Sequence, residues 1–182
     1  MKARAVNWFG LAGGIVTILL IIVSINTPWW RLTIGNGVFR VDASPININL
    51  NLIGNVFTIP LIWAFNLASI LLLAASGVAL MVYSLYPSKS YSKSLLSFGY
   101  KKPFYAVVLF TVALAALTFI AKSILSVDLP FYGSSSVKIS FGGQEANIEM
   151  LTFAEFVWPF WLGIVAAGLC IAARLYHRKL ET

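Results

Sequence analysis

The sequence predicts an α-helical integral membrane protein, an antiparallel bundle of four spans with a small antiparallel β-sheet on its outer side. Four long apolar runs cover about 6–26, 58–84, 104–126 and 153–176. Each run is long enough to cross ~30 Å of hydrocarbon. The loops that follow the first and third runs alternate apolar and polar residues, as half-buried strands do. Basic residues gather in the remaining loop and near the chain ends, which predicts the orientation.

The composition makes a lipid bilayer the expected surroundings. Of the 182 residues 59% are hydrophobic and 10% charged, with a mean hydropathy of +0.86, too few charges to coat a soluble globule of this size. We expect one domain with outer loops 27–57 and 127–152 and an inner loop 85–103. The first run is longer than the apolar core of a signal peptide and lacks a small-x-small cleavage site, so we expect an uncleaved helix.

The distribution of charge indicates which side faces the cytoplasm. A net charge of +7 could suit nucleic-acid binding, but the cations are concentrated on one side of the four predicted spans. These nine are Lys2, Arg4, Lys89, Lys93, Lys101, Lys102, Arg174, Arg178 and Lys179. The positive-inside rule then predicts a multi-pass protein of the cell membrane with both termini cytoplasmic. The basic side suits anionic lipid, and no nucleic-acid partner is expected.

The first outer loop predicts a β-hairpin. Asn36-Gly37 suits a type I′ turn because both residues tolerate positive φ. Counting outward sets Arg31 opposite Asp42, a pairing that stabilises a ladder by roughly 0.2 to 1 kcal/mol. The apolar face then holds Trp30, Leu32, Ile34, Phe39 and Val41. Residues 45–52 alternate Ile or Leu with Asn and predict a third strand.

The second outer loop predicts another hairpin in residues 137–150. A turn at Gly143-Gln144 sets Lys138 opposite Glu149, whereas a turn at Gly142-Gly143 keeps the two faces but loses this ion pair, so we prefer the first. The five predicted strands form one sheet over the outer end of the bundle, three from the first loop and two from the second. The candidate framework of this outer sheet is Trp30, Arg31, Asp42, Lys138 and Glu149.

Within the predicted spans, strongly polar side chains are few. Asn66 is the deepest, and Thr118 lies at a similar depth, where it could hydrogen-bond Asn66. An interhelical hydrogen bond and a transport site remain alternative interpretations. At the start of the fourth span, Thr152 and Glu155 predict a capping box, and Pro159 predicts a kink.

Aromatic and small residues complete the expected bundle. We expect an outer aromatic belt at one membrane interface, formed by Trp29, Trp30, Trp63, Trp158 and Trp161. Small residues spaced by four predict close helix contacts, at Gly10 with Gly14, Ala75 with Ala79 and Gly163 with Ala167. The single Cys170 allows no internal disulfide, so other contacts must hold the outer loops.

Residue patterns that carry catalytic chemistry are missing from the sequence. It has one histidine, His177, and no Walker loop, GxSxG, HExxH or GxGxxG motif. No carboxylate lies in the middle of a predicted span, which disfavours proton relays. We therefore expect a protein that is not an enzyme and needs neither cofactor nor metal.

Four spans, an outer sheet fed by both outer loops, and a tryptophan just beyond the first span resemble the claudin-like tetraspan proteins. Trp29 or Trp30 takes the place of that family's first tryptophan, while its GLW motif and its pair of first-loop cysteines are absent here. The resemblance covers the whole chain as topology. It implies the fold and does not extend to a paracellular barrier or pore.

Three functions compete at this point. The first is interaction, with a second copy or with a partner in a membrane complex, through the outer sheet and the bundle, because unpaired strand edges accept other strands. The second is an accessory subunit of a membrane oxidoreductase or respiratory complex. The third is transport of a small neutral or lipidic molecule, using Asn66.

Overall fold

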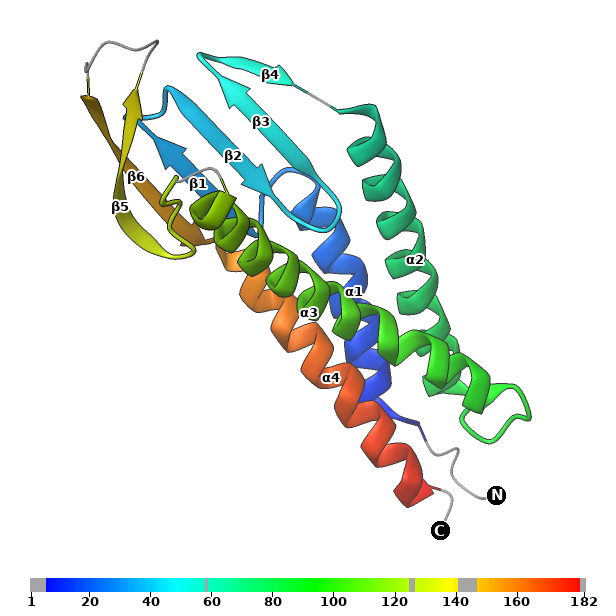
Figure 1. The fold of residues 1–182 in the computed structure, drawn as a ribbon. Helices are drawn as coiled ribbons and strands as arrows, with labels where there is room; N and C mark the ends of the chain where they lie inside the picture. Colours follow the sequence, from blue (N-terminus) through cyan, green and yellow to red (C-terminus); the bar gives the residue numbers. More distant parts are fainter. Residues whose placement is uncertain (1–5, 58, 125–126, 141–146, 181–182) are drawn as a thin grey trace.

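The computed structural model describes residues 6–57, 59–124, 127–140 and 147–180 of the chain. The helices and strands appear in the following order: α1 (Trp8–Ser24), β1 (Trp30–Ile34), β2 (Phe39–Ala43), β3 (Ile48–Leu52), β4 (Asn55–Phe57), α2 (Pro60–Leu85), α3 (Ser92–Ile124), β5 (Gly133–Ser140), β6 (Asn147–Phe156) and α4 (Trp158–Leu180). Figure 1 shows the sheet at one end of an elongated bundle and both termini at the other. We call these the outer end and the inner end.

The four helices pack in a ring in which α1 and α3 each contact both α2 and α4. Helices α2, α3 and α4 are long and apolar enough to cross a membrane, whereas α1, with 17 residues, is a shorter apolar helix. Gly14 of α1 and Gly77 of α2 mark a close helix contact, since a Cβ at Gly14 would lie 2.7 Å from the Gly77 carbonyl oxygen. The predicted spacing identified Gly14, but not its partner.

Both outer loops contribute to one antiparallel sheet with the order β4-β3-β2-β1-β6-β5. The register of β1 and β2 is the predicted one, with Arg31 opposite Asp42. The type I′ turn is also confirmed, since Asn36 has φ 52° and Gly37 φ 93°. Strand β6 pairs with β1, so the second loop joins the sheet beside the first strand.

The prediction of five strands was wrong, because a sixth strand, β4, follows β3. Leu52 pairs with Asn55, which leaves Ile53 and Gly54 as a two-residue turn with φ 51° and 81°. Gly54 N donates to Asn51 Oδ1 at 2.9 Å, and Ile53 N donates to Val38 O at 2.9 Å. The third strand is also shorter than predicted, since β3 begins at Ile48.

The second hairpin has the preferred register. Lys138 is opposite Glu149, and Val137 is opposite Met150. The predicted turn at Gly143-Gln144 lies outside the described residues.

The starts of α3 and α4 differ from the predicted span starts. The capping box was wrong: Thr152 and Glu155 lie in β6, paired with β1. Pro159 is the second residue of α4, where no helical N–H is needed, so the predicted kink has no cause there. The third helix starts at Ser92 rather than near 104 and includes Pro103, so it takes up most of the predicted loop 85–103. Helix α2 starts at Pro60, close to the predicted start at 58.

Two of the five expected belt tryptophans lie in the core instead. Trp29 is fully buried, donates from Nε1 to Ser24 Oγ at 2.8 Å, and packs edge-on against Phe110 and Phe160. Trp30 packs with Leu114 where the apolar face of the sheet meets the outer half of α3. The other three, Trp63, Trp158 and Trp161, are exposed. The pair Trp29 and Trp30 therefore joins sheet and bundle.

Candidate functional site: the sheet edge and the lateral groove

The outer sheet is held by the framework that the sequence predicted around β1 and β2. Arg31 Nε lies 2.8 Å from Asp42 Oδ1, and Arg40 Nη2 lies 2.6 Å from Asp42 Oδ2. One carboxylate therefore joins two guanidinium groups on neighbouring strands. Trp30 Nε1 donates to Phe131 O at 2.9 Å, which ties β1 to the segment after α3. Of the other framework pair, Lys138 and Glu149, only the backbone register is described.

The two edges of the described sheet differ in chemistry. On β4, Val56 and Phe57 are exposed, and so are the preceding Ile53 and the following Ile59. Strand β5, at the opposite edge, has the sequence GSSSVKIS and exposes Ser134 and Ser136. Apart from Asn55 at its start, the β4 edge is thus apolar, and the β5 edge is polar where its side chains are described.

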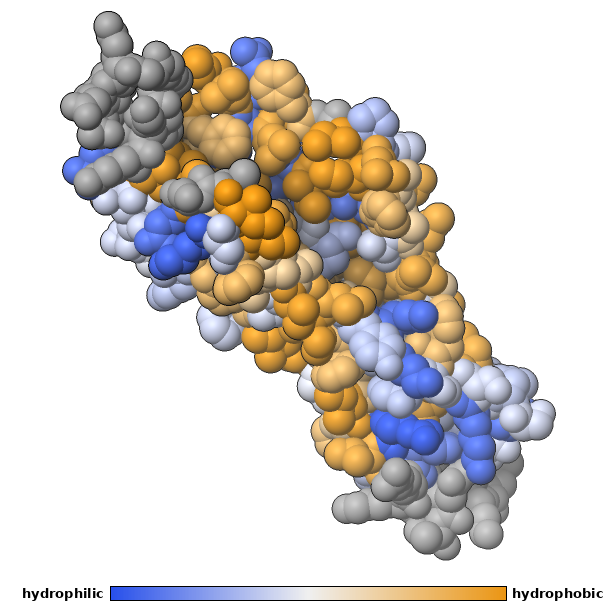
Figure 2. Space-filling model, viewed as in Figure 1, coloured by the Kyte–Doolittle hydropathy of each residue, from blue (hydrophilic) through white to orange (hydrophobic). Residues whose placement is uncertain are grey.

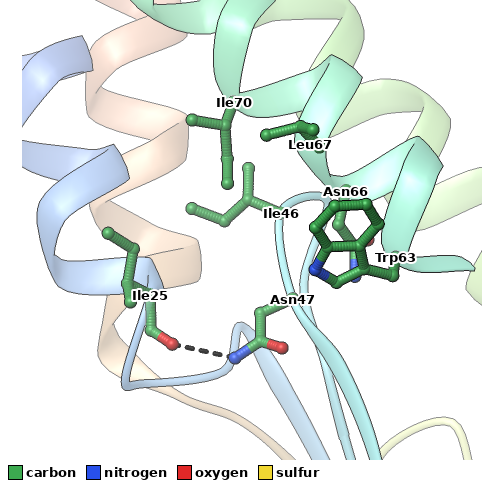
Figure 3. A pocket seen from close by; sticks show the side chains of 7 residues that line it. All are labelled: Ile25, Ile46, Asn47, Trp63, Asn66, Leu67 and Ile70. Carbon is green, nitrogen blue, oxygen red and sulfur yellow. Dashed lines mark hydrogen bonds between the residues drawn. The ribbon is translucent and has the colours of Figure 1, made fainter. Parts of the chain in front are cut away.

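Asn66 lies where α2 stands away from the rest of the bundle. No residue of α2 before Leu73 is buried, whereas seven residues from Leu73 to Ser84 are. Asn66 lines a hollow of about 220 Å³ between the end of α1, the β2–β3 turn and α2. Figure 3 shows Trp63 and Asn66 beside each other on α2, and Asn47 on the β2–β3 turn pointing toward Ile25. Asn47 Nδ2 donates to Ile25 O at 2.8 Å, which joins the β2–β3 turn to the end of α1.

Asn66 also lines a second and larger hollow of about 580 Å³ between α2 and α3, which we call the lateral groove. Its lining includes Ser44 and Pro45 of the β2–β3 turn, Phe65, Asn66 and Ser69 of α2, and Lys102, Leu109 and Ala113 of α3. Most of this lining is apolar. A groove of this kind, open beside exposed apolar side chains such as Phe65 and Leu109, can take an apolar molecule.

Thr118 does not line the lateral groove with Asn66. Its Oγ1 donates to Ala115 O in its own helix at 3.0 Å. Among the described residues, no side-chain hydrogen bond joins Asn66 to Thr118. Asn66 therefore lines both hollows without a hydrogen bond to Thr118.

A buried polar cluster at the inner end was missed by the sequence analysis. Asn7 is fully buried, and its Nδ2 donates to Tyr83 Oη at 2.8 Å and to Ala173 O at 3.0 Å. Its Oδ1 accepts from Gly10 N and caps α1. His177, the single histidine, is also buried, with its ring edge-on to Tyr83. The capping asparagine before an apolar run was the only available signal.

Metal-binding and catalytic arrangements are not evident in the part of the chain that the structure describes. No group of three or more His, Cys, Asp or Glu residues there could hold a metal ion. The chain matches no protein-family model and no curated protein sequence. A functional proposal therefore has to be drawn from two features of the structure, the apolar edge of the sheet and the groove beside Asn66.

Proposed function

We propose that this chain is a claudin-like, four-span protein of the cell membrane, with both termini cytoplasmic, that is not an enzyme and works by binding another membrane protein along β4. The observation that carries the proposal is the contrast between the two sheet edges. Val56 on β4 is 59% exposed, whereas β5 presents serines. Edge strands are commonly protected by charged side chains or proline, and β4 (Asn55–Phe57) carries neither.

The conformation of the turn before β4 also supports a binding role for the β4 edge. Ile53 has φ 51° and is 74% exposed. A β-branched residue therefore adopts a left-handed conformation, and burial of its side chain does not offset the strain. This conformation costs roughly 1–2 kcal/mol for an L-residue. Strain of this kind gathers at functional positions. The equivalent turn of the first hairpin has Asn36, which tolerates the same φ of 52°.

The chemistry of the surface indicates what kind of partner fits it. The exposed apolar residues continue from β4 into the start of α2 through Ile59, Leu61 and Trp63. A partner that covers both parts needs an extramembrane strand to pair with β4 and a membrane helix to lie beside α2. A second copy of this chain has both, and so does a larger membrane complex.

Photo-crosslinking in the native membrane tests the proposal. p-Benzoylphenylalanine in place of Val56 should give a protein adduct, whereas the same residue in place of Ser136, on the β5 edge, should give none. An adduct of twice the chain's mass identifies a second copy, and a heavier adduct that carries a haem or flavin protein identifies an oxidoreductase partner. Equal adducts at the two positions, or none at either, would contradict docking along β4.

A further inference from the structure

The lateral groove begins where α2 and α3 separate. Toward the inner end the two helices are in tight contact, since a Cβ at Gly99 would lie 2.6 Å from Leu80 Cγ and 3.1 Å from Ser76 O. Further out, α3 has no buried residue between Pro103 and Leu114. The groove of about 580 Å³ lies over this stretch and under the β2–β3 turn.

A basic hollow lies at the inner end of the lateral groove. It has a volume of about 410 Å³ and is lined by Ser94, Ser97, Phe98, Lys101 and Lys102. Two ammonium groups and two hydroxyls there can all donate hydrogen bonds to an anion. Figure 2 shows hydrophilic residues gathered at this end of the molecule and apolar surface over its middle.

Lys102 joins the two spaces because it lines both of them. Its Nζ lies 5.3 Å from the centroid of the Phe98 ring, which is one turn nearer the start of α3. The apolar stem of Lys102 can therefore cover the end of the groove while its charge points toward the hollow, as snorkelling lysines do.

The length of the groove matches one leaflet of a bilayer. Lys122 follows Lys102 by twenty residues of α3, which is ~30 Å of helix and equals the hydrocarbon thickness. Lys122 pairs with Asp128 at 3.1 Å, so both ends of this stretch are polar. From Lys102 to Ala113 the groove follows roughly 17 Å of helix, slightly more than half of that thickness.

We propose that the lateral groove and the basic hollow form one binding site for a single anionic phospholipid of the inner leaflet. The phosphate would accept hydrogen bonds from Lys101 and Lys102, with Ser94 and Ser97 beside them, and one acyl chain would occupy the groove toward Ala113. The site matches such a lipid in charge and in polarity. The two lysines lie where the headgroup phosphate would be, and the apolar groove lies where the acyl chain would be. This site is independent of the β4 edge.

The test uses the full chain reconstituted in nanodiscs of equal parts phosphatidylglycerol and phosphatidylcholine, followed by native mass spectrometry. The wild-type chain should retain one phosphatidylglycerol. The double variant Lys101→Gln with Lys102→Gln should lower its occupancy about tenfold or more. The matched double variant Lys89→Gln with Lys93→Gln removes two exposed lysines of the same side that do not line the hollow and should leave occupancy unchanged.

A second pair of variants tests the groove itself. Ala113→Phe fills the groove and should lower phosphatidylglycerol occupancy about tenfold, whereas Ala116→Phe, at an exposed position outside the lining, should not. Soluble glycerol phosphate at millimolar concentration should not displace the lipid. Displacement by glycerol phosphate, or equal retention by all four variants and the wild type, would overturn the proposal.

Discussion

Gly14 and Gly77 bring the backbones of α1 and α2 together. A Cβ built on Gly14 would lie 2.7 Å from Gly77 O, and one built on Gly77 would lie 3.1 Å from Gly14 O. The contact is reciprocal, and neither carbonyl can move without shifting its helix. Close approach at small residues is a main source of helix association in membranes, where the hydrophobic effect does not drive helices together.

Gly14→Ala should therefore destabilise the bundle. Overpacking of this kind costs about 1–3 kcal/mol, so the variant should unfold at a lower temperature in detergent when followed by circular dichroism. Gly168→Ala is the matched control, because among the described residues no atom outside its chain neighbours and its own helix backbone lies within 4 Å of a Cβ at that position. There the gain in helix propensity should leave stability equal or raise it by about 0.5–1 kcal/mol. Equal destabilisation of the two variants would contradict a specific contact at Gly14.

Asp42→Asn should weaken the outer sheet, because it neutralises the carboxylate that joins Arg31 and Arg40. The Arg31 and Asp42 side chains are only 28% and 20% exposed. We expect a loss of about 1 kcal/mol in the free energy of unfolding, the upper part of the range for exposed pairs. Chemical denaturation in micelles measures it.

Asp128→Asn is the control for that experiment. Its pair with Lys122 has side chains 70% and 58% exposed, so solvent screening should leave a change close to zero. If Asp128→Asn cost as much as Asp42→Asn, the bridging position of Asp42 would not matter.

The sequence predicted those elements whose information is local. Asn36-Gly37 fixes its own turn, and the register of β1 and β2 follows from it. Ile53-Gly54 forms the same kind of turn, but isoleucine carries no local turn signal. That turn depends on Val38 O and Asn51 Oδ1, which accept its two N–H groups.

Long-range pairing overrode one local pattern near the start of α4. Thr152 and Glu155 have the spacing of a capping box, yet β1 and β5 pair with this segment from both sides and keep it extended. Local propensity gives way when tertiary hydrogen bonds compete with it. Strand β6 extends to Phe156 because its residues from Thr152 to Phe156 pair with β1. The sequence predicted the two hairpins but not this pairing between them.

The candidate sites were predictable only in part, for a related reason. Asn66 could be recognised as a polar residue within a long apolar run, but the groove beside it results from the separation of α2 and α3, which depends on contacts at Leu80 and Gly99. Asn7 was missed because its partners Tyr83 and Ala173 are 76 and 166 residues away. Single-sequence patterns do not report such distances.

Asn7→Ala should destabilise the inner end of the bundle. It removes an α1 cap and the hydrogen bonds to Tyr83 Oη and Ala173 O. Unmet buried polar groups cost about 1–3 kcal/mol, which thermal unfolding in detergent should detect. Asn26→Ala, at an exposed asparagine just after α1, should change the midpoint little. Similar midpoints for both variants would show that burial of Asn7 contributes nothing to stability.

Cys170 should resist aqueous thiol reagents in the folded protein. Its side chain is fully buried in α4, and a Cβ at Gly13 of α1 would lie 3.2 Å from its Sγ. N-Ethylmaleimide should label the wild-type chain only after unfolding in hot dodecyl sulfate, with mass spectrometry as the readout. A cysteine introduced by Ile53→Cys, at an exposed turn, should react within minutes under native conditions. Rapid native labelling of Cys170 would place α1 and α4 further apart than described.

Ile53→Asn separates the stability of the sheet from its proposed function. Asparagine tolerates the φ of 51° that Ile53 adopts, so relief of strain should raise the free energy of unfolding of the isolated protein by about 1 kcal/mol. The same change removes an exposed apolar side chain beside β4, so photo-crosslinking from position 56 should fall. A more stable protein that binds its partner less well is the result expected of a residue retained for binding.

The reciprocal variant Asn36→Ile provides the control at the matching turn position. Asn36 has φ 52° and is exposed, so isoleucine there should lower stability by about 1 kcal/mol. Crosslinking from position 56 should be unchanged, because the β1–β2 turn does not belong to the β4 edge. If Ile53→Asn left crosslinking intact while raising stability, the strain at Ile53 would have no connection with docking, and the proposed role of the β4 edge would lose its second support.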